Sequence, residues 1–344
     1  MDIGDRRYVL VWSVPGAAAR GPEAGRSCSM PDAAALAPDV RDGHRRAVAR
    51  AITAVENGLE GADRLVDALY PHTGRAWRIG VTGPPGAGKS TLVDRLVGAF
   101  RARGQTVAVV AVDPSSPFSG GALLGDRVRM DHYAEDDGVF IRSLAARGAL
   151  GGLSEATEAA CDVLDASGSD VILVETVGVG QGEIDVAQAT DTTLVVLVPE
   201  SGDAVQTMKA GLMEVADVFC VNKADKPDAP HLVRALRAML HLRAEADWSP
   251  TVVTTSATAG EGIGRLVDAL DAHRAHLDPR WEAVRAERLR RRVRRLVEAA
   301  WRRDFWAGGR AAALAEAVGR LDEEARAPHA LAARLLGDRL GGGS

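Results

Sequence analysis

The sequence predicts an α/β fold in which a mostly parallel central sheet is flanked by helices. Short apolar runs rich in β-branched residues, at 107–112, 171–174 and 193–198, are typical of parallel strands buried on both faces. Segments with apolar residues at helical spacing separate such runs, so strands and helices alternate along the chain. A glycine-rich loop joins the predicted strand at 77–81 to the helical pattern that follows it.

That loop, residues 83–90, reads Gly-Pro-Pro-Gly-Ala-Gly-Lys-Ser and has the spacing G-x-x-x-x-G-K-[ST]. Its glycines allow a tight turn in which successive backbone N–H groups and a helix N-terminus face phosphate oxygens. The pattern predicts a P-loop NTPase domain that binds a nucleoside triphosphate. We expect Lys89 to reach the β- and γ-phosphates and the Ser90 hydroxyl to ligate Mg²⁺. The predicted phosphate-binding residues are Gly83, Pro84, Pro85, Gly86, Ala87, Gly88, Lys89, Ser90 and Thr91.

Acidic residues at or near strand ends are candidates for the Mg²⁺ shell. Asp113 and Glu175 each end a predicted strand, and the carboxyl ends of parallel strands face the nucleotide crevice. Asp126, in a segment of small residues, is a further candidate, whereas Asp113 has the alternative of capping a turn. We expect the Gly178 N–H to contact the γ-phosphate. Lys89, Asp113, Asp126 and Glu175 are thus the predicted catalytic residues, and Ser90 joins the three carboxylates around the metal.

A second motif predicts the base. Asn222, Lys223 and Asp225 follow a predicted strand, and a carboxylate at Asp225 can accept hydrogen bonds from guanine N1–H and N2–H₂, which adenine does not offer as a pair. Ser256 and Ala257 follow the next predicted strand, where the Ala257 N–H is expected to contact guanine O6. With both elements present, GTP is expected as the nucleotide, bound as GTP or GDP with Mg²⁺.

Composition excludes several classes of protein. The net charge of −5 argues against nucleic acid as the main partner. The three cysteines lie far apart without C-x-x-C spacing, which argues against a disulfide framework and favours a reducing cytoplasm. No apolar run approaches the roughly 18–20 residues of a membrane helix, so no membrane partner is expected.

The chain is expected to divide into four parts. Residues 1–29 are interpreted as a disordered or spurious extension with Met30 as the true start, because the short apolar stretch in them is interrupted and unlike a signal peptide. Residues 30–74 form N-terminal helices, 75–278 the GTPase domain, and 279–344 a helical arm. Its arginine-rich stretch is expected at a dimer or partner interface, with a solvated face as the alternative.

These motifs together resemble the methylmalonyl-CoA mutase-associated GTPases, the MeaB/ArgK-type branch of the SIMIBI class. The resemblance implies a Mg²⁺-dependent GTPase that acts as a chaperone of an adenosylcobalamin-dependent acyl-CoA mutase, gating cofactor loading and protecting or reactivating the enzyme. It further implies a homodimer formed through the C-terminal helices and an additional switch at 202–209. It extends over about 31–303, and the stretches that carry it are 83–90, 113–117, 120–130, 175–183, 199–214, 222–225 and 256–257.

The sequence departs from the family pattern at Gly182, where a serine is usual, and at Glu200, which replaces a small residue. Val179 occupies the place of the water-orienting glutamine of Ras-like GTPases, so unaided hydrolysis is expected to be slow. Three alternatives stay open: a P-loop kinase of the type associated with amino-acid transport, a nickel-insertion GTPase, and a regulator that uses GTP only as a binding switch. The eight histidines form no obvious metal cluster, which disfavours the nickel alternative.

Overall fold

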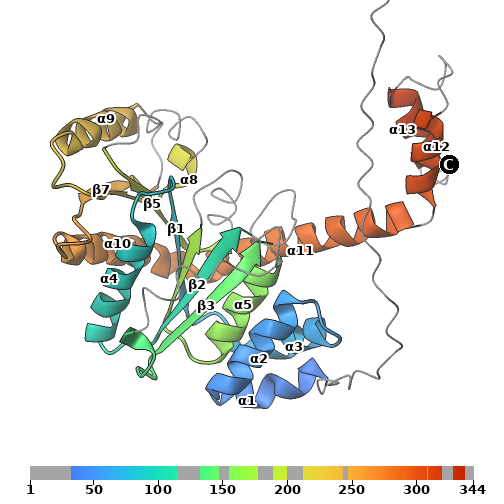
Figure 1. Ribbon diagram of the computed structural model, residues 1–344, viewed down its shortest axis with the longest axis horizontal. Helices are drawn as coiled ribbons and strands as arrows, with labels where there is room; N and C mark the ends of the chain where they lie inside the picture. The colour runs from blue at the N-terminus through green and yellow to red at the C-terminus, as the bar shows by residue number, and fades with distance from the viewer. Residues whose placement is uncertain are drawn as a thin grey trace, which may run out of the picture.

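A computed structural model of the chain confirms the predicted fold class. Seven parallel strands form one sheet in the order β3-β2-β4-β1-β5-β6-β7, with helices on both faces (Figure 1). The expectations for residues 1–29 and Met30 lie outside the described residues. The structure describes residues 32–114, 132–146, 155–176, 189–199, 212–242, 247–307, 309–319 and 328–337.

The strands form where the sequence has short apolar runs, and in β1, β4, β5 and β6 the side chains alternate between two buried faces. In the central strand, for example, Ile79 and Val81 are fully buried on one face. The strands are β1 (Trp77–Thr82), β2 (Val107–Pro114), β3 (Val139–Ala146), β4 (Val171–Thr176), β5 (Thr192–Leu197), β6 (Val218–Val221) and β7 (Thr251–Thr254).

One face of the sheet is covered by α4 (Lys89–Ala102) and α10 (Ile263–Leu277). Leu92, Leu96 and Phe100 recur at helical spacing on α4 and are fully buried against the sheet. This packing fixes the start of α4 over the carboxyl end of β1. The helix therefore begins at the point where the phosphate loop ends.

The other face is covered by α2 (Arg45–Glu56), α3 (Ala62–Leu69), α5 (Glu155–Ala166) and α9 (Ala229–His241). The first two confirm the predicted N-terminal helices and their break near residues 58–61. The sequence analysis assigned no helix to 229–241, although Leu232, Val233 and Leu236 have helical spacing and are buried. The short elements are η1 (Ala33–Leu36), α1 (Ala37–Arg41), η2 (Tyr70–His72), α8 (Met213–Val215) and η5 (Asp278–Arg280).

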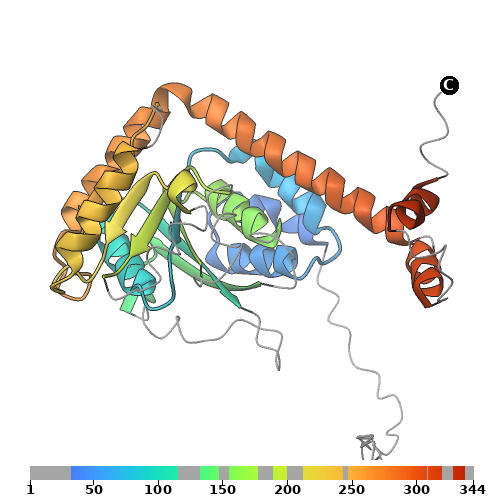
Figure 2. The same ribbon diagram turned by 90° about the horizontal axis from the view of Figure 1, so that it is seen from above.

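The predicted arm begins with one long helix, α11 (Trp281–Ala307), which runs along the body and then past it. Figure 2 shows α12 (Arg310–Gly319) and α13 (Pro328–Leu336) at its far end. Where α11 begins, the Trp281 Nε1–H donates to Gly74 O at 3.1 Å. Within the described residues, no helix combines the length and the apolar character needed to cross a membrane.

Candidate functional site

The phosphate loop adopts the glycine-dependent geometry that its sequence predicts. Gly83 has φ of 139°, and a Cβ built on it would lie 2.0 Å from the carbonyl oxygen of Val196 in β5. Gly88 has φ of 83°, and its Cβ would lie 2.6 Å from Nδ2 of Asn222. Side chains at either position would collide with the neighbouring strand ends, so the loop is packed tightly against both.

Lys89 and Ser90 open α4, and Thr91 follows in its first turn. The Lys89 side chain is buried, and its Nζ donates to the carbonyl oxygens of Gly83 at 2.9 Å and Pro84 at 3.1 Å. The ammonium group therefore lies against the phosphate loop, at the place where a triphosphate would bind. Because these carbonyl oxygens are neutral acceptors, phosphate oxygens would compete for the same donor on electrostatic grounds.

Ser90 and Glu175 are brought together as predicted. The Ser90 hydroxyl donates to Oε1 of Glu175 at 2.6 Å, and Glu175 is buried at the carboxyl end of β4, in register with Val81 of β1. A hydroxyl beside a carboxylate supplies the hard oxygen donors that Mg²⁺ prefers. This pair therefore fits the metal that the sequence predicts.

The rest of the predicted metal shell is only partly visible. The backbone of Asp113 lies at the carboxyl end of β2, two residues beyond Ala111, which is in register with Glu175. Its side chain, Asp126 and Gly178 lie outside what the structure describes. Among the described residues, no group of three or more histidine, cysteine, aspartate or glutamate side chains is arranged to hold a metal ion.

Asn222 connects the predicted base-binding motif to the phosphate loop. Its buried side chain donates from Nδ2 to Ala87 O at 2.9 Å. Its Oδ1 accepts from the Thr255 hydroxyl and from the Ala257 N–H, both at 3.1 Å. The Asn222 side chain therefore forms hydrogen bonds both with the phosphate loop and with the residues that follow β7.

Lys223 has φ of 53° and is the one residue other than glycine with positive φ among the described residues. Such a conformation costs about 1–2 kcal/mol and is found where surrounding contacts enforce it. Here the Ala224 N–H donates to Thr255 O at 2.9 Å, and the Ser256 hydroxyl donates to Oδ1 of Asp225 at 2.9 Å. The turn thus holds the exposed Asp225 carboxylate in place, which is what a guanine-reading group requires.

The Ala257 N–H, which was predicted to contact guanine O6, already donates a hydrogen bond to Oδ1 of Asn222. Guanine O6 would have to share this donor with Asn222.

The sequence analysis missed Arg95, which lies on α4 and donates hydrogen bonds to the backbone carbonyl oxygens of Ala257 and Thr258 in the loop after β7. An arginine six residues after the loop lysine carries no sequence signal of such a contact. Only the packing of α4 beside the β7–α10 loop reveals it.

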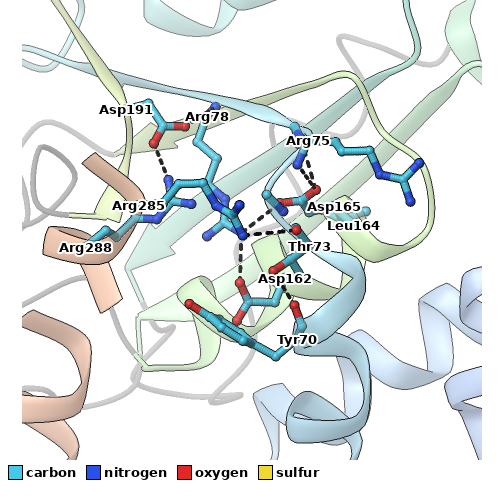
Figure 3. Close-up of polar contacts among 12 residues, drawn as sticks. Tyr70, Thr73, Arg75, Arg78, Asp162, Leu164, Asp165, Asp191, Arg285 and Arg288 are labelled. Carbon is cyan, nitrogen blue, oxygen red and sulfur yellow. Dashed lines mark hydrogen bonds and ion pairs between the residues drawn. The ribbon is translucent and has the colours of Figure 1, made fainter. Parts of the chain in front are cut away.

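A second charged cluster lies where α11 crosses the body, and it is built around Arg78 of β1 (Figure 3). The buried Arg78 guanidinium contacts Asp162 at 2.8 Å and Asp165 at 3.3 Å, both on α5. Asp165 also accepts hydrogen bonds from the N–H groups of Gly74 (2.7 Å) and Ala76 (3.0 Å). Burial alone would raise the pKa of Asp162, but Arg78 and Arg292 outweigh it and hold this pKa below its ordinary value.

Three arginines of α11 complete this cluster. Arg288 pairs with one carboxylate oxygen of Asp191. The other carboxylate oxygen of Asp191 accepts a hydrogen bond from the backbone N–H of Arg78 at 2.9 Å. The remaining pairs are Arg292 with Asp162 and Arg295 with Glu158. The expectation that the arginine-rich face meets a dimer partner or solvent is therefore wrong for Arg288 and Arg292, whose side chains are largely buried against acidic residues of the same chain, and Arg295 pairs with a third such residue while staying partly exposed.

Comparison with known proteins identifies the family. A family model described as methylmalonyl-CoA mutase-associated GTPase MeaB matches residues 48–309. A putative GTPase of Pyrococcus abyssi is 46% identical over 310 residues, which cover 88% of this chain and 96% of that protein. GTPase ArgK of Escherichia coli K12 is 40% identical over 240 residues, which cover 67% of this chain and 72% of ArgK.

A solved structure has the same fold. The crystal structure described as LAO/AO transport system kinase matches with a TM-score of 0.70 and 28% sequence identity, covering 89% of this chain and 97% of that one. The family match covers more than half of the chain and includes both nucleotide motifs. The chain therefore belongs to the methylmalonyl-CoA mutase-associated GTPase (MeaB) family and is a GTPase that binds guanine nucleotide.

Proposed function

We propose that this GTPase is Mg²⁺-dependent and acts as a chaperone of an adenosylcobalamin-dependent acyl-CoA mutase. In this role it gates the loading of the cofactor and protects or reactivates the mutase. The observation that carries the proposal is the family match over residues 48–309, whose description names association with methylmalonyl-CoA mutase. Hydrolysis of the bound nucleotide would control when the GTPase and the mutase associate, because GTP and GDP present different charges to the surrounding loops.

Different residues of the chain would have different roles in hydrolysis. Lys89 would neutralise the β- and γ-phosphates, and Asn222 would keep the phosphate loop aligned with the base site. Mg²⁺, when bound, would offset phosphate charge at a shell formed by Ser90, Asp113, Asp126 and Glu175. The proximity of the Ser90 hydroxyl to the Glu175 carboxylate supports this assignment. A water then attacks the γ-phosphate in line, and hydrolysis releases inorganic phosphate.

The signal to the mutase is proposed to pass through the loops that follow the sheet on its nucleotide side. The Gly178 N–H would contact the γ-phosphate, and residues 202–209 would form the switch that the partner reads. Both lie outside the described residues. The support is their place in the sequence: each follows a buried parallel strand, β4 or β5, whose carboxyl end lies at the nucleotide site.

We also propose a homodimer formed through the arm, residues 279–344. Leu289, Val293, Val297 and Trp301 recur every fourth residue of α11, and each is more than a third exposed. An apolar stripe of this kind on a helix that extends past the body is typical of a helix–helix interface. The arginines that pair with the body lie on a different side of the helix and leave the stripe accessible.

A cytoplasmic location is proposed on cysteine usage. Cys161 and Cys220 are free and buried, and burial raises the pKa of each thiol to about 12. Among the residues that the structure describes, neither forms a disulfide. Thiols of this kind persist in a reducing compartment.

The proposal is tested by measuring release of inorganic phosphate from GTP and from ATP, with the protein alone and with candidate cobalamin-dependent mutases added. We expect slow GTP hydrolysis that one mutase accelerates. Lys89→Ala should abolish both hydrolysis and GTP-dependent control of cofactor loading. Normal control of loading in that variant would remove the nucleotide from the mechanism, and transfer of the γ-phosphate to a substrate instead of water would favour the kinase alternative.

The dimer is tested by sedimentation velocity. Val293→Asp combined with Val297→Asp should convert the dimer to a monomer, because both changes place charge in the apolar stripe. Ala299→Asp, on the opposite side of α11 and also exposed, is the matched control. A monomeric parent protein, or a double variant that stays dimeric, would contradict this interface.

A further inference from the structure

Arg95 joins the helix of the phosphate loop to the loop that follows β7. It lies on α4, and its Nε–H donates to the carbonyl oxygen of Ala257 at 2.9 Å. Its Nη2 donates to the carbonyl oxygen of Thr258 at 3.1 Å. A guanidinium presents several donors in a fixed plane, so one side chain holds two successive peptide groups.

Ala257 is thereby held from both sides. Its N–H donates to Asn222 at the end of β6, and its carbonyl oxygen accepts from Arg95 on α4. Asn222 in turn donates to Ala87 in the phosphate loop, and that loop leads directly into α4. These contacts close a ring: phosphate loop, Asn222, Ala257, Arg95 and back to the phosphate loop through the first two turns of the helix.

The segment held in this way is short, with a buried start and an exposed tip. Residues 256–261 are closed at their base by two backbone hydrogen bonds of 3.1 Å between Ser256 and Glu261. Thr258 and Gly260 at the tip are exposed, so little side-chain packing fixes the tip. The contact of Arg95 with Thr258 therefore fixes the backbone where side-chain packing is sparse, and its contact with Ala257 fixes the buried start of the loop.

We propose that Arg95 is a positioning residue for guanine recognition. By fixing the 256–261 loop against the phosphate helix, it holds the Ala257 backbone and the Ser256 hydroxyl, which supports Asp225, in the arrangement that reads the base. The inference rests on the guanine-reading roles proposed for Asp225 and Ala257. It does not depend on the mutase partner.

A positioning role of this kind predicts an effect on the base that spares the phosphates. A guanine nucleotide must order the loop when Arg95 is absent, and that entropic cost weakens its binding. Pyrophosphate contacts only the phosphate loop and makes no use of residues 256–261. An adenine nucleotide lacks the hydrogen bonds that the ordered loop would provide, so its binding depends mainly on its phosphates.

The experiment is isothermal titration calorimetry with GDP, ADP and pyrophosphate on the full chain and three variants. Arg95→Ala should weaken GDP binding about tenfold, as expected for the loss of hydrogen bonds from a charged donor, while ADP and pyrophosphate change less than about twofold. Arg95→Lys, which keeps the charge but only one of the two contacts, should fall between. Circular dichroism and thermal unfolding establish that each variant is folded.

Arg103→Ala is the matched control. Arg103 lies at the C-terminal end of the same helix and pairs with Asp271 of α10 at 2.6 Å, so it also links the two helices but lies away from the loop. This variant should bind all three ligands as the parent protein does. A similar loss of GDP affinity in Arg103→Ala would show that helix packing, and not the loop contact, is responsible.

Other outcomes separate this inference from the assignments beneath it. Equal weakening of GDP, ADP and pyrophosphate in Arg95→Ala, or no weakening of any, overturns the role of Arg95. A parent protein without preference for GDP over ADP overturns the guanine-reading roles of Asp225 and Ala257 together with it. If no mutase responds to the GTPase while the GDP preference is intact and Arg95-dependent, only the chaperone proposal fails.

Discussion

Asn222 donates a hydrogen bond of 2.9 Å from its side-chain amide to the backbone carbonyl oxygen of Ala87, and so joins two motifs separated by 135 residues. The asparagine is buried, and its carbonyl oxygen accepts two further hydrogen bonds, from Thr255 and Ala257. An amide is suited to this place because it offers a donor and an acceptor in one plane. The geometry of the phosphate site and of the base site is therefore set by one side chain.

Replacing Asn222 by alanine should disturb both sites. The change leaves the buried Ala87 oxygen and the Ala257 N–H without this partner, and each unsatisfied buried group costs about 1–3 kcal/mol. We expect the free energy of unfolding to fall by about 2–4 kcal/mol and GDP binding to weaken with it. Urea denaturation and calorimetry measure the two effects. Asn57→Ala is the control, since Asn57 makes an exposed contact at the end of α2 and should change neither quantity appreciably.

Gly83→Ala tests the close approach of the phosphate loop to β5. An added Cβ would lie 2.0 Å from Val196 O, and φ of 139° is unfavourable for alanine. The loop must therefore move, and we expect GDP binding to be lost. Gly264→Ala provides the contrast: it lies in α10 with open space around it and should raise stability by about 0.5–1 kcal/mol. GDP binding that survives Gly83→Ala unchanged would refute the contact with Val196.

The sequence predicted the sheet well because its central strands are short, apolar and buried, a pattern that does not depend on distant residues. It also put Ser90 and Glu175 at one site, since Glu175 ends β4, which lies beside β1, and Ser90 is joined to the end of β1 by the phosphate loop. The helix at 229–241 was missed although its apolar spacing is regular, so in that case the signal was present and unused.

Contacts between distant side chains could not be predicted in the same way. Arg292 and Asp162 are 130 residues apart, and Arg95 and Ala257 are 162 apart. No local pattern distinguishes Arg292 from the exposed Arg290 two residues earlier. Which arginine faces the body is decided by the direction in which α11 leaves α10, and that direction is a property of the folded chain.

The difference between these two arginines gives a stability prediction. Arg292 is 13% exposed and pairs with the buried Asp162, whereas Arg290 is 66% exposed and pairs with Glu287 on its own helix. Removal of one partner of a buried pair costs about 3–5 kcal/mol, and removal of an exposed pair less than about 1 kcal/mol. Arg292→Met should therefore destabilise the protein strongly and Arg290→Met hardly at all in urea denaturation. Equal effects would show that Asp162 does not depend on the arm for its charge balance.

A final prediction concerns pH and the buried His273 of α10. The Thr192 hydroxyl accepts a hydrogen bond from the Trp77 Nε1–H at 2.9 Å and shares another of 2.9 Å with Nδ1 of His273. The other ring nitrogen, Nε2, lies 3.4 Å from Oδ1 of Asp217. Burial, reinforced by the nearby His276 and Arg280, lowers the pKa of His273 to about 4.

The unfolded chain takes up a proton on this imidazole near its ordinary pKa of 6.5, but the folded protein does so only near pH 4. Between these values the unfolded state binds more protons, so the stability contributed at neutral pH is lost as the pH falls. Between pH 7 and pH 4.5 we expect the unfolding free energy of the parent protein to fall by about 2–3 kcal/mol more than that of His273→Gln. His231→Gln, an exposed control on α9, should keep the parent profile. If His273→Gln and the parent protein lose stability in parallel over this range, the imidazole is already protonated in the folded state and its pKa is not lowered by burial.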